Sequence, residues 1–62
     1  MSKNHRMKVG DRVKSLGRNT KTGEIKHLIY DPFGGPAYEV QWDEEEPGLC
    51  HWVEEEELEL NK

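Results

Sequence analysis

The sequence predicts a small all-β domain, in which five short antiparallel strands form one sheet that closes into a barrel. Apolar and polar residues alternate over short runs, most clearly at Tyr38, Val40 and Trp42. Glycine, proline and acidic residues separate these runs at close spacing. No segment has a helical apolar period over about ten residues. Closure is expected because a domain of this size has little else to cover its edge strands.

The chain has 62 residues and one cysteine, and 35% of its residues are charged. A chain of this length forms one domain with a small core, since it buries only about 60% of the surface that its unfolded form exposes. Cys50 alone forms no internal disulfide. No run approaches the roughly 20 apolar residues of a membrane span, and no secretory signal follows the basic start. We therefore expect a cytoplasmic protein without membrane association.

Charge is distributed unevenly along the chain. Residues 1–30 carry eight Lys or Arg against two acids, whereas residues 31–62 carry eleven acids against Lys62. Such asymmetry can mark a charged partner. It also arises when the two halves lie side by side in one sheet and neutralise each other, and we favour this second explanation.

The first part of the chain contains a tail, a strand and a loop. Residues 1–7 are polar and basic without an apolar period, so we expect a flexible basic N-terminal tail, followed by a barrel over residues 8–62. Val9, Val13 and Leu16 are expected on the apolar side of the first strand, after a local turn at Gly10 and Asp11. The polar run GRNTKTG is then a loop.

The second strand is expected over residues 24–30, EIKHLIY, and its alternation is imperfect. Strict alternation places Ile25, His27 and Ile29 on one face, and it places Leu28 and Tyr30 with Lys26 on the other. Apolar residues on both faces are typical of a strand that bends across a barrel.

The remaining elements follow strong turn signals. In DPFGGP, Pro32 fixes φ and the two glycines permit a positive φ, while Pro36 suits the first residue of a strand. The third strand is expected over residues 37–43 and the fourth over 49–53, separated by the turn EEEPG. Residues 54–57 predict a short irregular or 3₁₀ link, and residues 58–60 a closing strand.

Four segments of the sequence together resemble one family of small barrels. These are VGDRVKS, TGEIKHL, YEVQWDEE and HWVEEEELEL, which cover roughly positions 8–60. Their layout is similar to SH3-like barrels of the Tudor-like type, and several families of small bacterial single-domain proteins share it. The resemblance implies the fold and places Val53 inside and Trp52 outside. The sequence itself leaves this register open, because a one-residue slip reverses every side chain.

The resemblance also implies a mode of binding. Tudor-like domains often hold methylated lysine or arginine in an aromatic cage, and Trp42 and Trp52 match two aromatic positions of that pattern. The first loop, LGRNTKTG, lacks the aromatic residue that the family usually has there. Tyr30 and Phe33 are the candidates to complete the cage from the other side.

The leading hypothesis for function is non-catalytic recognition of a basic peptide or protein surface. A cation binds well over a Trp face, and nearby acids strengthen such a site. Each tryptophan here is followed by acidic residues, so the expected surface includes Asp43 to Glu46 and Glu54 to Glu57. The candidate ligand-binding residues are Trp52, Trp42, Asp43, Glu44, Glu54, Tyr30 and Phe33. The acidic runs are otherwise solvated faces, or a mimic of nucleic-acid charge.

The main alternative is nucleic-acid binding through the basic first half. Its candidate phosphate contacts are Arg12, Lys14, Arg18, Lys21 and Lys26. A net charge of −4 opposes this reading, and the first strand has no aromatic residue on which bases could stack. A third possibility is a structural subunit that is stable only inside a larger assembly, although a monomer is equally compatible with the sequence.

The sequence offers little support for catalysis, a metal or a cofactor. Cys50 and His51 are adjacent in an expected strand, so their side chains point to opposite faces. No CxxC or HxxxH spacing exists, and Cys50 lies between two acidic runs rather than beside the positive charge that a catalytic thiolate needs. We therefore expect a protein that is not an enzyme.

Overall fold

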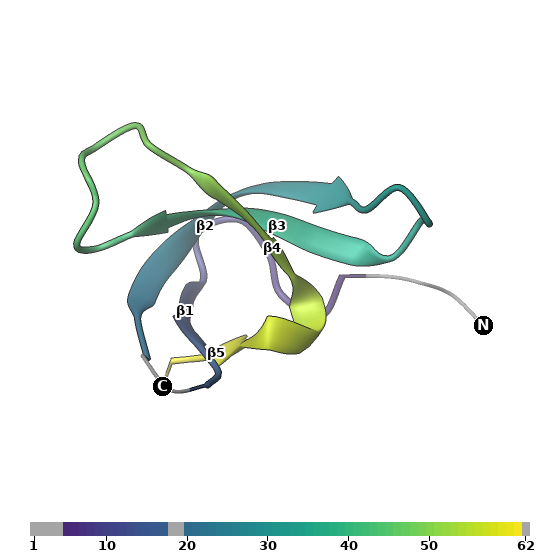
Figure 1. The fold of residues 1–62 in the computed structure, drawn as a ribbon, viewed down its shortest axis with the longest axis horizontal. Coiled ribbons are helices and arrows are strands. Elements are labelled where there is room, and N and C mark those ends of the chain that lie inside the picture. Colours follow the sequence, from purple (N-terminus) through teal and green to yellow (C-terminus); the bar gives the residue numbers. More distant parts are fainter. Residues whose placement is uncertain (1–4, 18–19, 62) are drawn as a thin grey trace.

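The computed structural model describes residues 5–17 and 20–61, and their fold is an all-β sheet (Figure 1). The strands are β1 (Arg12–Ser15), β2 (Thr22–Tyr30), β3 (Pro36–Trp42), β4 (His51–Glu54) and β5 (Leu58–Leu60), and the 3₁₀ turn η1 (Glu55–Glu57) links β4 to β5. Five antiparallel strands and the short link before the last one are confirmed. In the part of the chain described, no helix is long and apolar enough to cross a membrane.

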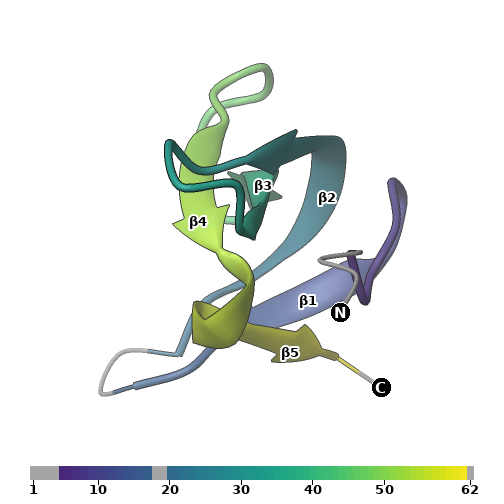
Figure 2. The same cartoon turned by 90° about the vertical axis from the view of Figure 1, so that its right-hand side faces the viewer.

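The strands form one antiparallel sheet in the order β4-β3-β2-β1-β5, which is compatible with an SH3-like fold. The prediction of a closed barrel is wrong, because β4 and β5 remain the two edges of the sheet. Both edge strands are short, and η1 carries the chain from one to the other across the opening. Figure 2 shows the curled sheet with η1 between β4 and β5.

The core lies on the inner, concave face of this curled sheet. It consists of Met7, Val13, Ile25, Tyr38, Val40, Trp42 and Leu58, with Val53 packed against it. The alternation of the third strand is therefore confirmed, since Tyr38, Val40 and Trp42 are all buried. Val9 and Leu16 differ from expectation. They lie outside β1 and are more than half exposed, because the chain enters and leaves that strand by turns.

A β-bulge in β2 changes the predicted faces of the second strand. Ile25 pairs with Val40 and Leu28 pairs with Tyr38, with a register shift between Ile25 and His27. Residues that pair directly point to the same face. Ile25 and Leu28 therefore share the inner face although they are three positions apart, whereas His27 lies on the outer face. Strict alternation was wrong here because a bulge inserts one extra residue.

Residues 5–7, expected in the N-terminal tail, pack against the sheet. Met7 is buried in the core, and the backbone amides of Arg6 and Met7 each donate to Tyr38 Oη at 3.1 Å. The Tyr38 hydroxyl in turn donates to Glu55 at 2.5 Å. Residues 5–7 therefore belong to the fold, and the amides of Arg6 and Met7 supply the hydrogen bonds that the buried Tyr38 hydroxyl needs. Residues 1–4 lie outside the described part of the chain.

Gly23 lies inside β2, although the sequence placed it at the end of a loop. A Cβ at this position would lie 2.5 Å from the carbonyl oxygen of Gln41 and 2.9 Å from Trp42 Cε3. A strand glycine commonly marks such a close approach. Its absent side chain leaves the space into which the Trp42 ring packs, and this anchors the end of β3.

Candidate functional site

The two tryptophans lie on opposite faces of the sheet. Trp42 pairs with Gly23 and is only 6% exposed, so its ring belongs to the core. Trp52 pairs with Glu39 and is 52% exposed. Val53, the neighbour of Trp52, packs on the core. The register implied by the family resemblance is thus confirmed, whereas a surface that combines Trp52 with Trp42 does not form.

Acidic side chains flank Trp52 on the outer face. Glu39 is its direct partner across the ladder, and Glu54 follows two positions later on the same strand, so all three point to one side. Beyond Glu39, the ladder continues to His27, whose Nδ1 lies 3.2 Å from Glu39 Oε1. We call Trp52, Glu39, Glu54 and Asp31 the Trp52 surface.

Asp31 joins this surface from the turn between β2 and β3. Its Oδ1 accepts hydrogen bonds from the amides of Phe33 at 2.9 Å and Gly35 at 2.7 Å, which fix the carboxylate in place. Partial burial, and then the neighbouring Asp31, raise the pKa of Glu54 above its ordinary value. A hollow of about 270 Å³ lies between these two acids and η1. The local field therefore favours a cation.

The other predicted ligand-binding residues lie elsewhere. Asp43 accepts hydrogen bonds from Arg12 and from Thr22 Oγ1, and these bonds lower its pKa. Glu44 is exposed in the turn after β3. Asp43 lies four positions beyond Glu39, the paired partner of Trp52, and binds Arg12 and Thr22 instead, and neither Asp43 nor Glu44 pairs with β4.

Tyr30 and Phe33 do not complete an aromatic cage. Tyr30 pairs with Pro36 and therefore points to the inner face, opposite to Trp52, where its ring meets His5 at a centroid distance of 4.7 Å. Phe33 lies in the turn after β2 and is 89% exposed. Trp42 is buried in the core. The aromatic residues that the resemblance assembles are thus distributed over two faces and a turn.

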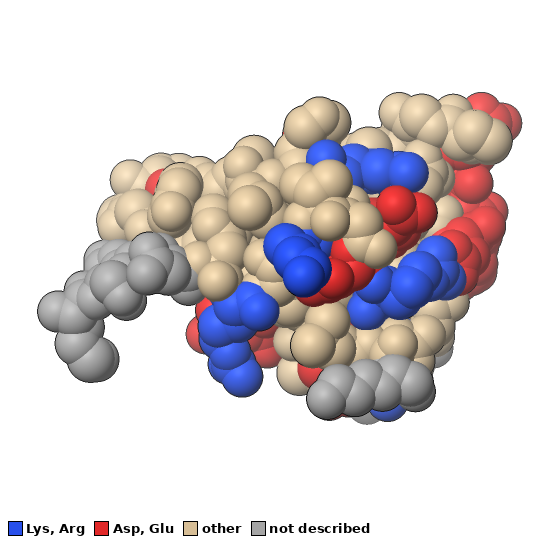
Figure 3. Space-filling view, turned by 180° about the vertical axis from the view of Figure 1, so that it is seen from behind, with Lys and Arg blue, Asp and Glu red and all other residues tan. Residues whose placement is uncertain are grey.

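Three of the candidate phosphate-binding residues lie next to carboxylates. Arg12 forms an ion pair with Asp43, Lys14 Nζ lies 3.4 Å from Glu59, and Lys26 Nζ lies 3.5 Å from Glu24. The amide of Lys21 donates to Ser15 Oγ, and Arg18 lies outside the described residues. Figure 3 shows basic and acidic side chains interleaved on this side. Two of these pairs, Arg12 with Asp43 and Lys14 with Glu59, join the basic half to the acidic half, as the favoured reading of the charge asymmetry predicts.

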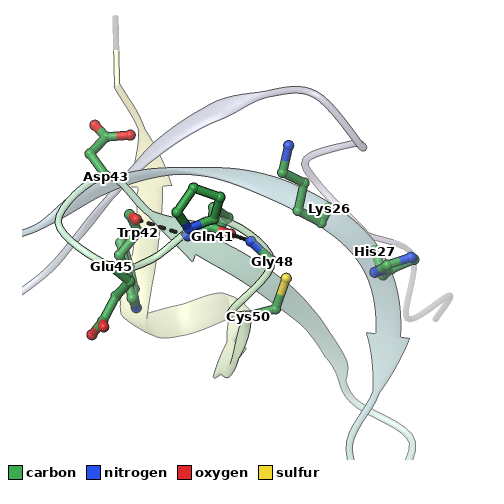
Figure 4. A pocket seen from close by; sticks show the side chains of 9 residues that line it. Lys26, His27, Gln41, Trp42, Asp43, Glu45, Gly48 and Cys50 are labelled. Carbon is green, nitrogen blue, oxygen red and sulfur yellow. Dashed lines mark hydrogen bonds between the residues drawn. The ribbon is translucent and has the colours of Figure 1, made fainter.

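Sequence reasoning missed a groove of about 580 Å³ between β2 and the loop after β3. The Gln41 side chain organises this loop, since its Nε2 donates to the Glu46 carbonyl at 2.9 Å and its Oε1 accepts from the Gly48 amide at 2.8 Å. Figure 4 shows Lys26 and His27 opposite this loop. The glutamine was a polar residue in an alternating strand, and nothing in the sequence distinguished it.

Cys50 lines this groove, whereas His51 lies 3.5 Å from Glu45. Within residues 5–17 and 20–61, no three His, Cys, Asp or Glu side chains form a group that could hold a metal ion. No family model, curated protein or solved structure matches this chain. The geometry of the Trp52 surface therefore carries the functional argument by itself.

Proposed function

We propose that this protein is a non-catalytic recognition module that binds a basic peptide or protein surface through the Trp52 surface. One observation carries the proposal: Trp52 is 52% exposed on the outer face, with Glu39 and Glu54 on the same face beside it. Tryptophan is enriched among the residues that dominate binding energies at protein interfaces.

The chemistry of the surface suits a lysine or arginine side chain. An indole face attracts a cation by about 0.5–1 kcal/mol at an exposed site and by about 2 kcal/mol when water is excluded. Glu39 and Glu54 add charge attraction, and Asp31 strengthens the negative potential next to Glu54. A ligand with two neighbouring basic residues could use the indole and the acidic hollow together.

The resemblance to Tudor-like domains supports this mode of binding in a reduced form. Tudor-like domains often enclose a methylated cation between several aromatic rings. Here Trp52 offers one ring, since Trp42 is buried and Tyr30 points to the inner face. We therefore propose that selectivity depends on charge and on the neighbouring acids more than on methylation.

Recognition of a basic protein is favoured over recognition of nucleic acid. A phosphate backbone would need Arg12, Lys14 and Lys26, and each of these already has a carboxylate neighbour. Binding there would compete with those ion pairs and would meet a chain with a net charge of −4.

The test uses an array of short synthetic peptides rich in lysine or arginine, with glutamate-substituted peptides for comparison, and follows binding by Trp fluorescence and calorimetry. Trp52→Ala should weaken binding of the best basic peptide by about tenfold or more. Glu39→Gln and Glu54→Gln should each weaken it less, and added salt should reduce the difference from wild type.

Phe33→Ala is the matched control, because Phe33 is also an exposed aromatic residue but lies outside the Trp52 surface. Glu44→Gln serves the same purpose for the acids. If Trp52→Ala and Phe33→Ala bind every peptide with the same affinity as wild type, the proposed site is wrong. Binding of an RNA or DNA oligonucleotide that is lost in Arg12→Ala would favour the alternative.

A further inference from the structure

Among the residues that the structure describes, the strand that carries Trp52 has a free edge. In the strand order β4-β3-β2-β1-β5, β4 pairs with β3 on one side only. An edge strand presents unpaired amide and carbonyl groups that can pair with another chain. Which residues of β4 present them depends on the alternation of the ladder.

The hydrogen bonds of Ile25 show which residues of β2 and β3 direct their amide and carbonyl groups toward which neighbouring strand. Its amide donates to the Asp11 carbonyl at 3.0 Å, and its carbonyl accepts from the Gly10 amide at 2.9 Å, so both groups point away from β3. Its partner Val40 must then direct its main chain toward β4. Asp43 lies an odd number of positions after Val40, so its main chain should point the other way, toward β2. Its amide does so, since it donates to the Thr22 carbonyl at 2.9 Å.

The direction of the Val40 main chain also determines which residues of β4 form hydrogen bonds with β3. Val40 pairs with His51 and Tyr38 pairs with Val53, so the main chains of His51 and Val53 face β3. The amide and carbonyl of Trp52 therefore point outward from the free edge. One residue thus offers an exposed indole on the outer face and two main-chain groups at the edge.

We propose that β4 binds its partner by strand addition, with an extended basic segment pairing antiparallel to β4 and a lysine or arginine opposite Trp52. This inference rests on the proposed function and specifies the conformation of the ligand. In an antiparallel pair, directly opposite residues point to the same face, so the cation lies beside the indole. Glu54 is then its diagonal neighbour on β4, and Glu39 lies on the other side of Trp52, on β3.

Charge selects a basic strand over a second copy of the chain. Glu39, Glu54 and Asp31 lie on the Trp52 surface beside β4. Pairing two copies through β4 would bring two such acidic surfaces together, whereas a basic segment would neutralise them. Antiparallel pairing also continues the pattern of every ladder in the described sheet.

The test uses a synthetic peptide in which lysine alternates with valine, in two N-methylated forms. With lysine opposite Trp52, the lysine amides face β4, because opposite residues in a hydrogen-bonded antiparallel pair exchange both bonds. Methylating the lysine amides should weaken binding by about tenfold or more. Methylating the valine amides, which face solvent, should leave binding nearly unchanged.

Hydrogen exchange measured on the protein tests the same pairing. When the peptide binds, the Trp52 amide should become protected from exchange, whereas the Val53 amide, already paired with β3, should not change.

The two proposals fail in different ways. If both methylated peptides bind as tightly as the parent while Trp52→Ala still abolishes binding, strand addition is wrong and recognition by the Trp52 side chain stands. A loss confined to the valine-methylated peptide also overturns the antiparallel arrangement. If the parent peptide does not bind, or if it binds Trp52→Ala as tightly as wild type, both proposals fall together. Dimerisation of the chain alone, detected by sedimentation and lost in Trp52→Ala, would identify a second copy as the occupant instead.

Discussion

Trp42 and Trp52 occupy similar sequence contexts and opposite structural roles. Each follows an alternating run and precedes acidic residues. Trp42 ends β3 on the inner face, packs beside Gly23 and is 6% exposed. Trp52 lies in the edge strand β4 on the outer face and is 52% exposed. The first residue contributes to the core, and the second is open to solvent.

The difference shows that register decides what an aromatic residue does. The paired partner of Trp42 is a glycine, which leaves space for the indole in the core. The paired partner of Trp52 is Glu39, a half-buried acid on the outer face. A shift of one residue between β3 and β4 would bury Trp52 and expose Val53, so the pairing itself is what makes Trp52 available.

The largest effect on stability is expected for Trp42→Ala. Removing a buried indole leaves a cavity and costs about 3–5 kcal/mol. The core of a domain this small supplies about that much net stability, so the variant should be largely unfolded in circular dichroism and amide spectra. Trp42→Phe, which keeps an aromatic ring beside Gly23, should retain the fold. An unchanged unfolding free energy for Trp42→Ala would show that Trp42 does not contribute to the core.

The next effect is expected for Tyr38→Phe, which tests the inner face without a large cavity. The Tyr38 hydroxyl joins the amides of Arg6 and Met7 to Glu55, and removing it should cost about 1–3 kcal/mol, measured by urea unfolding. Tyr30→Phe is the matched control, because Tyr30 is more than half exposed.

The same residue predicts a dependence on pH. Burial, and then the hydrogen bond to Glu55, raise the pKa of Tyr38 to about 12 from an ordinary 10.0. A raised pKa means that the folded chain holds the proton more tightly than the unfolded one. Its stabilising contribution is therefore complete below pH 10 and is lost as pH rises through about 12. Urea unfolding of wild type should show this loss, and the Tyr38→Phe variant should show less of it.

The smallest effect on stability is expected for Trp52→Ala, which should change the unfolding free energy by about 0.5 kcal/mol or less. Quenching of tryptophan fluorescence measures the difference in solvent exposure between the two tryptophans. A variant with only Trp52, made by Trp42→Phe, should be quenched readily by acrylamide, and a variant with only Trp42, made by Trp52→Phe, should be shielded. A large loss of stability in Trp52→Ala would assign Trp52 to the core and remove its proposed role.

Part of the candidate site was predictable, and the rest depended on contacts between distant segments. Trp52 and Glu54 belong to one local run, so they were found together. Glu39 and Asp31 were not associated with Trp52, because only the pairing of β3 with β4 and the turn after β2 bring them there. Asp43 and Glu44 are associated with the surface in the sequence only because they follow Trp42, whereas β3 pairs with Trp52 through Glu39, four positions before Asp43.

Five short strands, the turns between them and the inner face of β3 are predictable from local sequence, because alternation and turn residues act over a few neighbours. Tertiary structure decided the open edges, the bulge in β2, the docking of Met7 and the separation of the tryptophans. These features depend on which residues of different strands oppose one another. The periodicity of one strand carries no information about its partner, and for that reason only the folded sheet could place Trp52 at an acidic edge of the described sheet.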